Sequence, residues 1–187
     1  MKNFAGIFAL TCIMALLGSN ARAFTYSYWD GATDAPPGGL ASPTGIWENA
    51  NWSTVTGTTA PANNTVSTTA VQTYVESSDA HFCAGTASTG TYVITINNPH
   101  TVSGFDLDTV GNCTLTGPGV LSLTSTGDGF AVNTGATLTI NNVINGTTGG
   151  FINMSKTGFN GTLVLNAVNT FTGAASFGGV RCVTGTV

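Results

Sequence analysis

The segments Thr137-Leu138-Thr139-Ile140 and Thr162-Leu163-Val164-Leu165 alternate aliphatic side chains with side chains that are mainly threonine. Successive side chains of an extended strand point to opposite faces, so leucine and isoleucine share one face. Each segment is too short to bury that face alone. We therefore expect β-strands whose apolar faces are covered by neighbouring copies of the same pattern.

The same pattern recurs from Thr91 onward, in short runs separated by glycine or asparagine. Stacking successive coils would bury all the apolar faces in one continuous core, which favours a parallel β-helix, or solenoid. The runs are Tyr92–Ile96, Thr101–Leu107, Cys113–Leu115, Val120–Leu123, Phe130–Val132, Leu138–Ile140, Phe151–Met154 and Leu163–Leu165.

A sandwich of antiparallel hairpins would give the same strand spacing. Asparagine at the ends of the runs favours the parallel β-helix instead. Its backbone accepts left-handed angles at corners, and its amide can bond to an equivalent residue in the next coil. These residues are Asn97, Asn98, Asn112, Asn133, Asn141, Asn142, Asn153, Asn166 and Asn169.

Composition supports an all-β fold. Glycine (25), threonine (33) and asparagine (17) are abundant, and lysine, glutamate, glutamine and arginine are nearly absent. Threonine suits pleated surfaces, while glycine and asparagine suit tight corners. A disordered chain would lack the regularly placed valine, isoleucine, leucine and phenylalanine seen here.

Residues 1–23 are typical of a secretory signal peptide. Lys2 gives a positive start, Phe4 to Gly18 an apolar stretch, and Ala21-Arg22-Ala23 a cleavage site of small residues. An uncleaved anchor is the alternative, but the apolar stretch is short for the roughly 20 residues that span a bilayer. We expect cleavage after Ala23 and an exported protein.

Three zones follow the predicted signal. Residues 24–60 hold all three tryptophans and a proline-rich and glycine-rich loop, which predicts an irregular aromatic cap over one end of the solenoid. Residues 61–90 form a transition segment rich in threonine, serine and asparagine, with one expected strand at Val71–Val75. Residues 91–187 carry the solenoid repeats.

The charge of the chain and the spacing of its cysteines bear on whether it binds nucleic acid or a metal ion. Without residues 1–23, only Lys156 and Arg181 face eight acidic residues, which argues against nucleic acid as a partner. Cys83, Cys113 and Cys182 fit one disulfide and a free thiol, or three buried thiols. His81 near Cys83 is a weak hint of metal binding, and no cysteine pair has metal-site spacing, so we predict no metal and no cofactor.

The stretch from Lys156 to Leu165, followed by Asn169 to Gly173, resembles the autotransporter-associated β-strand repeat. That pattern reads Lys, x, Gly, x, Gly, then Leu-x-Leu, then Asn-Thr-Tyr-Thr-Gly. Here Phe159-Asn160 stand where the pattern has one residue, and Ala174–Phe177 follow the usual continuation loosely. The matching residues are Lys156, Gly158, Gly161, Leu163, Leu165, Asn169, Phe171 and Gly173.

The resemblance implies a right-handed parallel β-helix in the passenger domain of an autotransporter, at the cell surface of a Gram-negative bacterium or outside it. It also implies an outer-membrane barrel in the parent protein, which needs amphipathic strands that this sequence lacks. Because the chain stops at Val183–Val187 in mid-pattern, we expect a truncated piece of a longer protein. Several cysteines depart from the usual passenger composition.

The function expected is structural or adhesive and non-catalytic: a rod that meets glycans or host and neighbour cell surfaces through many weak hydrogen bonds, or a passive stalk. The alternative is a secreted β-helix polysaccharide lyase or hydrolase that uses Asp106 and Asp108, together with Asp128, as an acid/base pair or calcium site. Neither His81 nor His100 has a nucleophile motif around it. We therefore assign no catalytic residue.

Overall fold

The computed structural model describes residues 24–29, 42–57, 72–82, 89–108, 110–124, 129–146 and 160–171. In these ranges all regular structure is β-strand and there is no helix, which confirms the all-β prediction. No helix long and apolar enough to cross a membrane therefore occurs in this part of the chain. The predicted signal peptide, residues 1–23, lies outside the described residues.

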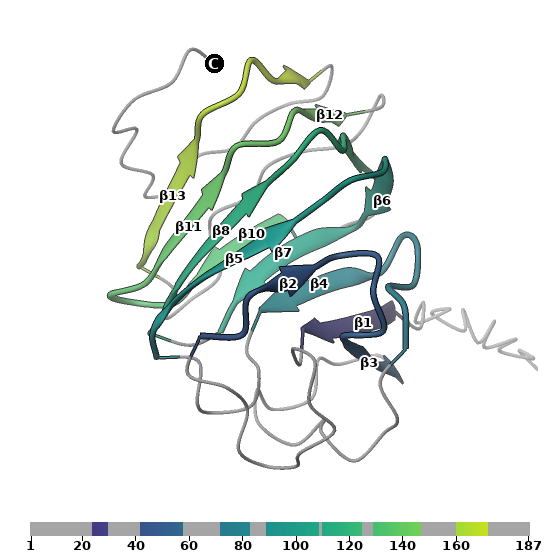
Figure 1. Cartoon of the computed structure of the whole chain (residues 1–187), viewed down its shortest axis with the longest axis horizontal. Coiled ribbons are helices and arrows are strands. Elements are labelled where there is room, and N and C mark those ends of the chain that lie inside the picture. Colours follow the sequence, from purple (N-terminus) through teal and green to yellow (C-terminus); the bar gives the residue numbers. More distant parts are fainter. Residues whose placement is uncertain are drawn as a thin grey trace, which may run out of the picture.

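The described strands form three sheets (Figure 1). Sheet A has the order β10 (Gly129–Val132), β7 (Gly104–Leu107), β4 (Asp79–Phe82), β1 (Phe24–Trp29) and β3 (Trp52–Gly57). Sheet B has the order β13 (Thr162–Leu165), β11 (Thr137–Ile140), β8 (Asn112–Thr116), β5 (Thr91–Thr95) and β2 (Gly45–Ile46). Sheet C has the order β14 (Thr170–Phe171), β12 (Ile144–Gly146), β9 (Leu121–Leu123) and β6 (His100–Val102).

Among the described strands, all pairings are parallel except that of β1 with β3. The chain visits sheets A, B and C in turn through β4, β5 and β6, again through β7, β8 and β9, and a third time through β10, β11 and β12. We call one passage through the three sheets a circuit, and residues that pair in adjacent strands of a sheet are one circuit apart in the sequence. Leu138, for example, pairs with Cys113 on one side and with Leu163 on the other.

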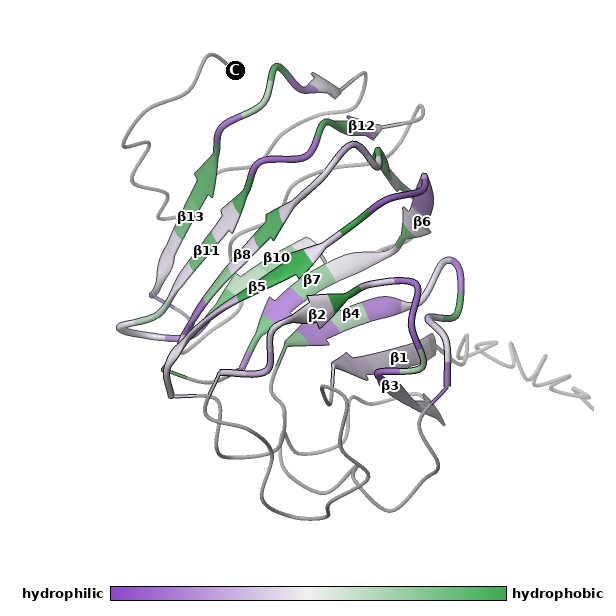
Figure 2. Cartoon of the chain, viewed as in Figure 1, coloured by the Kyte–Doolittle hydropathy of each residue, from purple (hydrophilic) through white to green (hydrophobic). Residues whose placement is uncertain are grey.

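The core lies between the sheets and is built from alternate side chains. Along β8 and β11, hydrophobic residues alternate with more polar ones (Figure 2), and along β5 buried residues alternate with more exposed ones. Leu138 and Cys113 are fully buried one above the other. On sheet A, the rings of Phe105 and Phe130 stack with centroids 5.0 Å apart. This stacking buries apolar faces that no single strand could cover.

The three tryptophans gather near the β1–β3 end of sheet A and are fully buried. The ring centroids of Trp47 and Trp52 lie 4.6 Å apart, and those of Trp29 and Trp52 lie 5.1 Å apart. Trp29 donates its indole N–H to the carbonyl of Pro43 at 2.7 Å, and Trp52 donates to Trp47 at 2.8 Å. Buried indoles usually require such partners.

Two sequence predictions differ from the structure. The run Thr101–Leu107 is not one strand, because the chain turns at Ser103 from β6 in sheet C to β7 in sheet A. No strand occupies the described residues of Val71–Val75, where Gln72 makes only an isolated bridge to Trp52. The strand in this region is β4, whose alternation spans only four residues and includes two ionisable side chains.

Asparagine and glycine occupy the corners between strands. The Asn166 amide donates to Oδ1 of Asn141, 25 positions earlier, at 2.8 Å, which confirms the expected bond between equivalent asparagines. Oδ1 of Asn169 accepts from the backbone N–H of Ile144 at 2.7 Å. At Gly161, a Cβ atom would lie 2.3 Å from the carbonyl oxygen of Asn133, so only glycine fits.

The repeat motif is described only in part. Gly161, Leu163, Leu165 and Asn169 belong to the described chain, and Phe171 does through its backbone. Lys156, Gly158 and Gly173 lie outside the described residues, as do Cys83 and Cys182.

Candidate functional site

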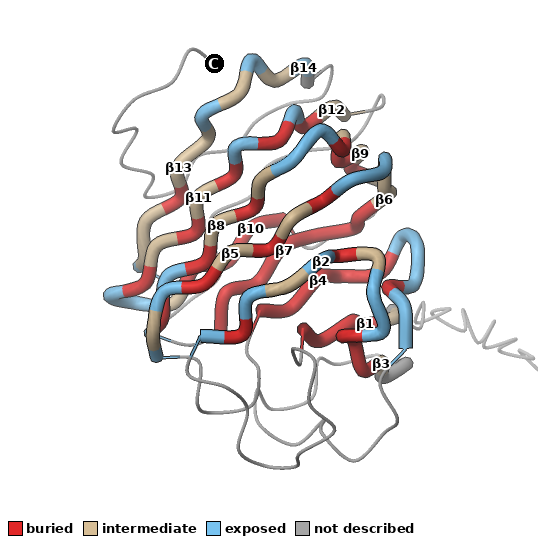
Figure 3. Tube along the Cα trace, in the orientation of Figure 1, coloured by how far each residue is buried: buried red, intermediate tan, exposed pale blue. Residues whose placement is uncertain are grey.

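Sheet A is buried on both faces, which sets it apart from sheet B. The strands β4, β7 and β10 are buried along their whole length (Figure 3). Ala80 and Phe82 on β4 belong to the core. Because side chains alternate along a strand, Asp79 and His81 point from the opposite face, and they too are almost fully buried.

The neighbouring strand β7 supplies two more ionisable residues to this second face. Phe105 and Leu107 enter the core, so Asp106 and the following Asp108 lie on the face of His81. The parallel register pairs His81 directly with Asp106. Strand register therefore gathers one histidine and three aspartates, and we call this set the His81 cluster: Asp79, His81, Asp106 and Asp108.

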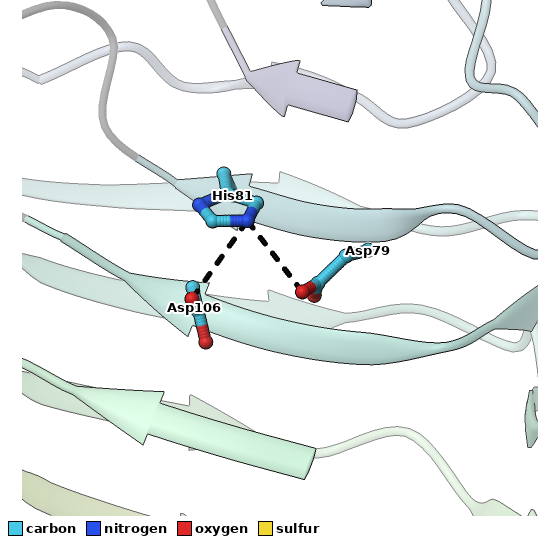
Figure 4. Close-up of side chains that lie close together, drawn as sticks. All are labelled: Asp79, His81 and Asp106. Carbon is cyan, nitrogen blue, oxygen red and sulfur yellow. Dashed lines mark ion pairs between the residues drawn. The ribbon is translucent and has the colours of Figure 1, made fainter. Parts of the chain in front are cut away.

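The geometry of the His81 cluster is asymmetric. Nδ1 of His81 lies 2.6 Å from Oδ2 of Asp108, a short hydrogen bond. Nε2 of His81 lies 3.6 Å from Oδ2 of Asp79 and 3.7 Å from Oδ2 of Asp106 (Figure 4). These two distances are ion-pair distances and exceed hydrogen-bond length.

Asp108 fixes the orientation of the imidazole. An ionised carboxylate can only accept hydrogen bonds. Nδ1 of His81 is therefore protonated and donates a hydrogen bond to Asp108. The aromatic ring of Tyr28 lies 4.6 Å from the imidazole, and that of Tyr26 meets it edge-on at 5.6 Å. Nε2 consequently faces Asp79 and Asp106.

Asp108 and Asp79 raise the pKa of His81. Burial alone would lower its pKa, but the hydrogen bond that His81 donates to Asp108 and the nearby charge of Asp79 outweigh burial and raise the pKa to about 10. Without a bound cation, His81 is therefore an imidazolium at neutral pH. Its positive charge compensates part of the negative charge that this face buries.

Several polar atoms of the His81 cluster have no hydrogen-bond partner although they are inaccessible to solvent. They are Oδ1 of Asp79, Nε2 of His81 and Oδ1 of Asp108. Buried polar atoms are usually satisfied, because an unsatisfied one costs about 1–3 kcal/mol. Their concentration in one cluster makes it a candidate binding site.

A second histidine cluster lies nearer the surface. Nδ1 of His100 lies 2.6 Å from Oε1 of Glu76, and Nε2 lies 3.4 Å from Oε1 of Glu48. Burial alone would raise the pKa of Glu76, but the contacts with His100 and Thr101 lower it overall. The pKa of Glu48 is also lowered, since hydrogen bonds from Asn98 and Asn97 outweigh its burial. Both histidines of the chain thus lie among carboxylates.

The structure brings together two of the three aspartates that the sequence singled out. Asp106 and Asp108 lie in the same cluster, but their exposed fractions are only 2% and 5%. Asp128 lies outside the described residues. Sequence reasoning missed Asp79 and paired His81 with Cys83 rather than with the aspartates. The sequence signal that could have found the cluster is the pair of alternating segments Asp79-Ala80-His81 and Asp106-Leu107-Asp108, which lie about one circuit apart.

Cys113 is the one cysteine of the described ranges, where it is a free thiol buried in the core. Burial raises the pKa of its thiol, so it stays neutral and unreactive in the folded chain. Cys113 pairs with Tyr92 and Leu138 in sheet B, whereas His81 lies on sheet A. It behaves as a small core residue.

The fold and the site together define an all-β protein of parallel sheets with a buried histidine–carboxylate cluster. Chemically, such a cluster can hold a cation or stay as a buried ion pair. No protein-family model, no curated protein and no solved structure matches the chain. The resemblance to the autotransporter-associated repeat accordingly stays a prediction.

Proposed function

We propose that this chain is part of a right-handed parallel β-helix that serves as a structural or adhesive module of an exported bacterial surface protein of the autotransporter type. The observation that carries the proposal is the cyclic order of the strands. Three successive circuits of the described chain, β4 to β6, β7 to β9 and β10 to β12, each contribute one strand to sheets A, B and C in turn. A rod of this kind grows by repeating one unit, which suits a stalk or a display surface.

Contacts between corners support the helical stacking. The bond between Asn166 and Asn141 joins residues one circuit apart, as does the bond from the Thr137 backbone N–H to Oδ1 of Asn112. Sheet A has β10 at one edge and the antiparallel strand β3 at the opposite edge, and the buried tryptophans lie beside β3. An antiparallel edge strand breaks the parallel pattern, which supports the proposal that residues 24–60 cap the rod.

The outer face of sheet B is suited to many weak polar contacts. Its outward positions include the neighbouring threonine pairs Thr114–Thr139 and Thr137–Thr162, and Val93 and Val164 flank the first pair. These outward threonines are partly exposed, and the described strands of sheet B contain no charged residue. Hydroxyl groups on a regular surface can bond to glycans without strong dependence on salt.

Burial of the aspartates favours a non-catalytic role over the lyase or hydrolase alternative. A general acid or base must reach its substrate, whereas Asp106 and Asp108 are almost inaccessible. Oδ2 of Asp108 is already engaged by His81. Cleavage of a polysaccharide by the purified chain, abolished by Asp106→Asn, would contradict the non-catalytic proposal.

Disulfide trapping tests the helical fold. Paired positions of adjacent strands lie about 4.8 Å apart, within the range that a disulfide spans. The double variant Thr114→Cys/Thr139→Cys should form an intramolecular disulfide under mild oxidation, identified by peptide mass mapping. Thr114→Cys/Val164→Cys is the matched control, because two strand spacings are too far. Equal trapping in both variants, or trapping in neither, would contradict the stacked helix.

A binding assay separates the adhesive module from a passive stalk. The purified chain is applied to an array of immobilised glycans and to whole cells, with Thr114→Asp/Thr139→Asp as the comparison. Reproducible binding that the aspartates abolish, with an unchanged far-UV circular dichroism spectrum, supports adhesion through sheet B. Absence of any binding by the native chain leaves the stalk role.

A further inference from the structure

We propose that Asp79, His81 and Asp106 bind one divalent transition-metal ion, zinc before others, through Nε2 of His81 and one carboxylate oxygen from each aspartate. This inference goes beyond the structural or adhesive role and does not depend on it. The three ligand atoms lie within 4.8 Å of one another on two adjacent strands. The ion would join β4 to β7 from the face opposite the core.

The spacing of the three groups fits a metal better than a hydrogen bond. Nε2 lies 3.6 Å from Asp79 and 3.7 Å from Asp106. Ligands bound to tetrahedral zinc at about 2.0–2.2 Å are roughly 3.3–3.6 Å apart. Small side-chain rotations are therefore enough to place all three atoms around one ion.

Asp108 supplies the support that a metal-binding histidine usually has. Histidine ligands commonly donate their other ring N–H to a carboxylate, which fixes the tautomer and the orientation of the ring. Nδ1 of His81 donates a hydrogen bond to Asp108 at 2.6 Å. A bound metal ion would displace the proton from Nε2 and take the lone pair that this proton leaves. Asp108 and His81 thus supply the carboxylate–histidine pair that commonly supports a bound metal ion.

Unsatisfied buried atoms give an independent reason to place a cation here. Nε2 of His81 and Oδ1 of Asp79 have no hydrogen-bond partner, and both residues are almost fully buried. Both atoms belong to proposed ligands. A cation would satisfy Nε2 directly, and it would offset the negative charge of the carboxylates.

The ligand set selects the class of ion. Imidazole nitrogen suits zinc and other transition metals, whereas calcium prefers six to eight oxygen ligands. One nitrogen and two carboxylates leave a fourth position open in a tetrahedral site. The ring of Tyr28 packs against the imidazole and limits access from that side. Because the ion would tie two neighbouring strands together, we infer that it stabilises the fold.

Zinc titration of the purified, chelator-treated chain tests the proposal. Zinc chloride is added both to the folded protein and during refolding, because the site is buried. Native mass spectrometry should show one bound zinc, and calorimetry should give a stoichiometry of one. The thermal unfolding midpoint should rise with zinc. An unchanged mass and midpoint in both arms would overturn the proposal.

Variants locate the ion. Asp79→Asn/Asp106→Asn should lose zinc binding, and Asp108→Asn should weaken it by about 10–100-fold, the usual effect of removing the carboxylate behind a histidine ligand. Glu76→Gln is the matched control, since it alters the other histidine–carboxylate cluster, and it should bind zinc as the native chain does. Loss of zinc in Glu76→Gln but not in Asp79→Asn/Asp106→Asn would overturn the assignment.

Cobalt substitution keeps the test decisive if a variant folds poorly. Cobalt(II) bound by the native chain in a four-coordinate site with one nitrogen and carboxylate oxygens should give visible absorption bands that zinc displaces. A spectrum of hexa-aqua cobalt alone would overturn the proposal without any variant.

Discussion

Nδ1 of His81 lies 2.6 Å from Oδ2 of Asp108, although the residues are 27 positions apart in the chain. The bond links a strand of one circuit to the end of the equivalent strand in the next. It also orients the imidazole toward Asp79 and Asp106. The direction in which Nε2 of His81 points therefore depends on its contact with Asp108.

Breaking the contact should destabilise the metal-free protein strongly. Asp108→Asn leaves the buried imidazolium with weaker compensation, and removing one partner of a buried ion pair costs about 3–5 kcal/mol. We expect a loss of that size in urea unfolding with a chelator present. Much of the loss should disappear when Asp108→Asn is made in a His81→Gln background. Equal losses in both backgrounds would show that the two side chains are not coupled.

Substitutions at neighbouring positions of β11 should change the free energy of unfolding by very different amounts, because only one of the two side chains is in the core. Leu138 is fully buried between Cys113 and Leu163, and Leu138→Ala should cost about 2–5 kcal/mol of unfolding free energy. Thr139 points outward and is partly exposed, so Thr139→Ala should change stability by less than about 1 kcal/mol. Chemical denaturation of both variants checks the alternation, and similar losses would contradict it.

Two glycines should respond differently to substitution. A Cβ at Gly161 would collide with the Asn133 carbonyl, so Gly161→Ala and Gly161→Asn should both cost about 1–3 kcal/mol. Gly135 has a φ of +85° and open space around it. Gly135→Ala should cost about 1–2 kcal/mol, and asparagine should recover part of the loss because it tolerates left-handed angles. Recovery by asparagine at Gly161 would contradict the close approach.

Acid should weaken the His100 cluster through Glu76. The pKa of Glu76 is lowered in the folded chain, so its contribution is present above about pH 4.5 and is lost as the pH falls through the folded pKa. The native chain should therefore lose more stability than Glu76→Gln between about pH 6 and about pH 3.5. Urea midpoints of both proteins at the two pH values measure the difference. Parallel losses would contradict the assigned pKa direction.

Cys113 should resist alkylation until the chain unfolds. Its thiol is fully buried, and burial raises its pKa, so the reactive thiolate is scarce. Iodoacetamide should label the peptide that contains Cys113 at least about 100-fold more slowly in buffer than in concentrated urea. Peptide mass spectrometry follows this residue separately from the other cysteines. Comparable rates in both solvents would show that sheet B is not packed as described.

The strand content could be predicted from local patterns. Thr137–Ile140 and Thr162–Leu165 are strands with the expected inward leucines, and the Asn141–Asn166 contact follows from the recurrence of asparagine at corners. The division of Thr101–Leu107 between two sheets could not be predicted in this way. The buried apolar side chains change parity between Val102 and Phe105, which indicates a break in the run. Which sheet each half joins depends on neighbours one circuit away, such as Ser78, whose carbonyl accepts from the Ser103 N–H at 2.9 Å.

The sequence by itself determined that this chain forms short strands with one apolar face, since alternation and corner residues act locally. Only the tertiary structure decided which strands become neighbours, and with them the His81 cluster. Asp79 and Asp106 meet one imidazole because the parallel register of β4 and β7 aligns segments one circuit apart. A slip of β7 by one residue within the sheet would turn these carboxylates toward the core, so the buried apolar face of β7 holds the register that forms the site.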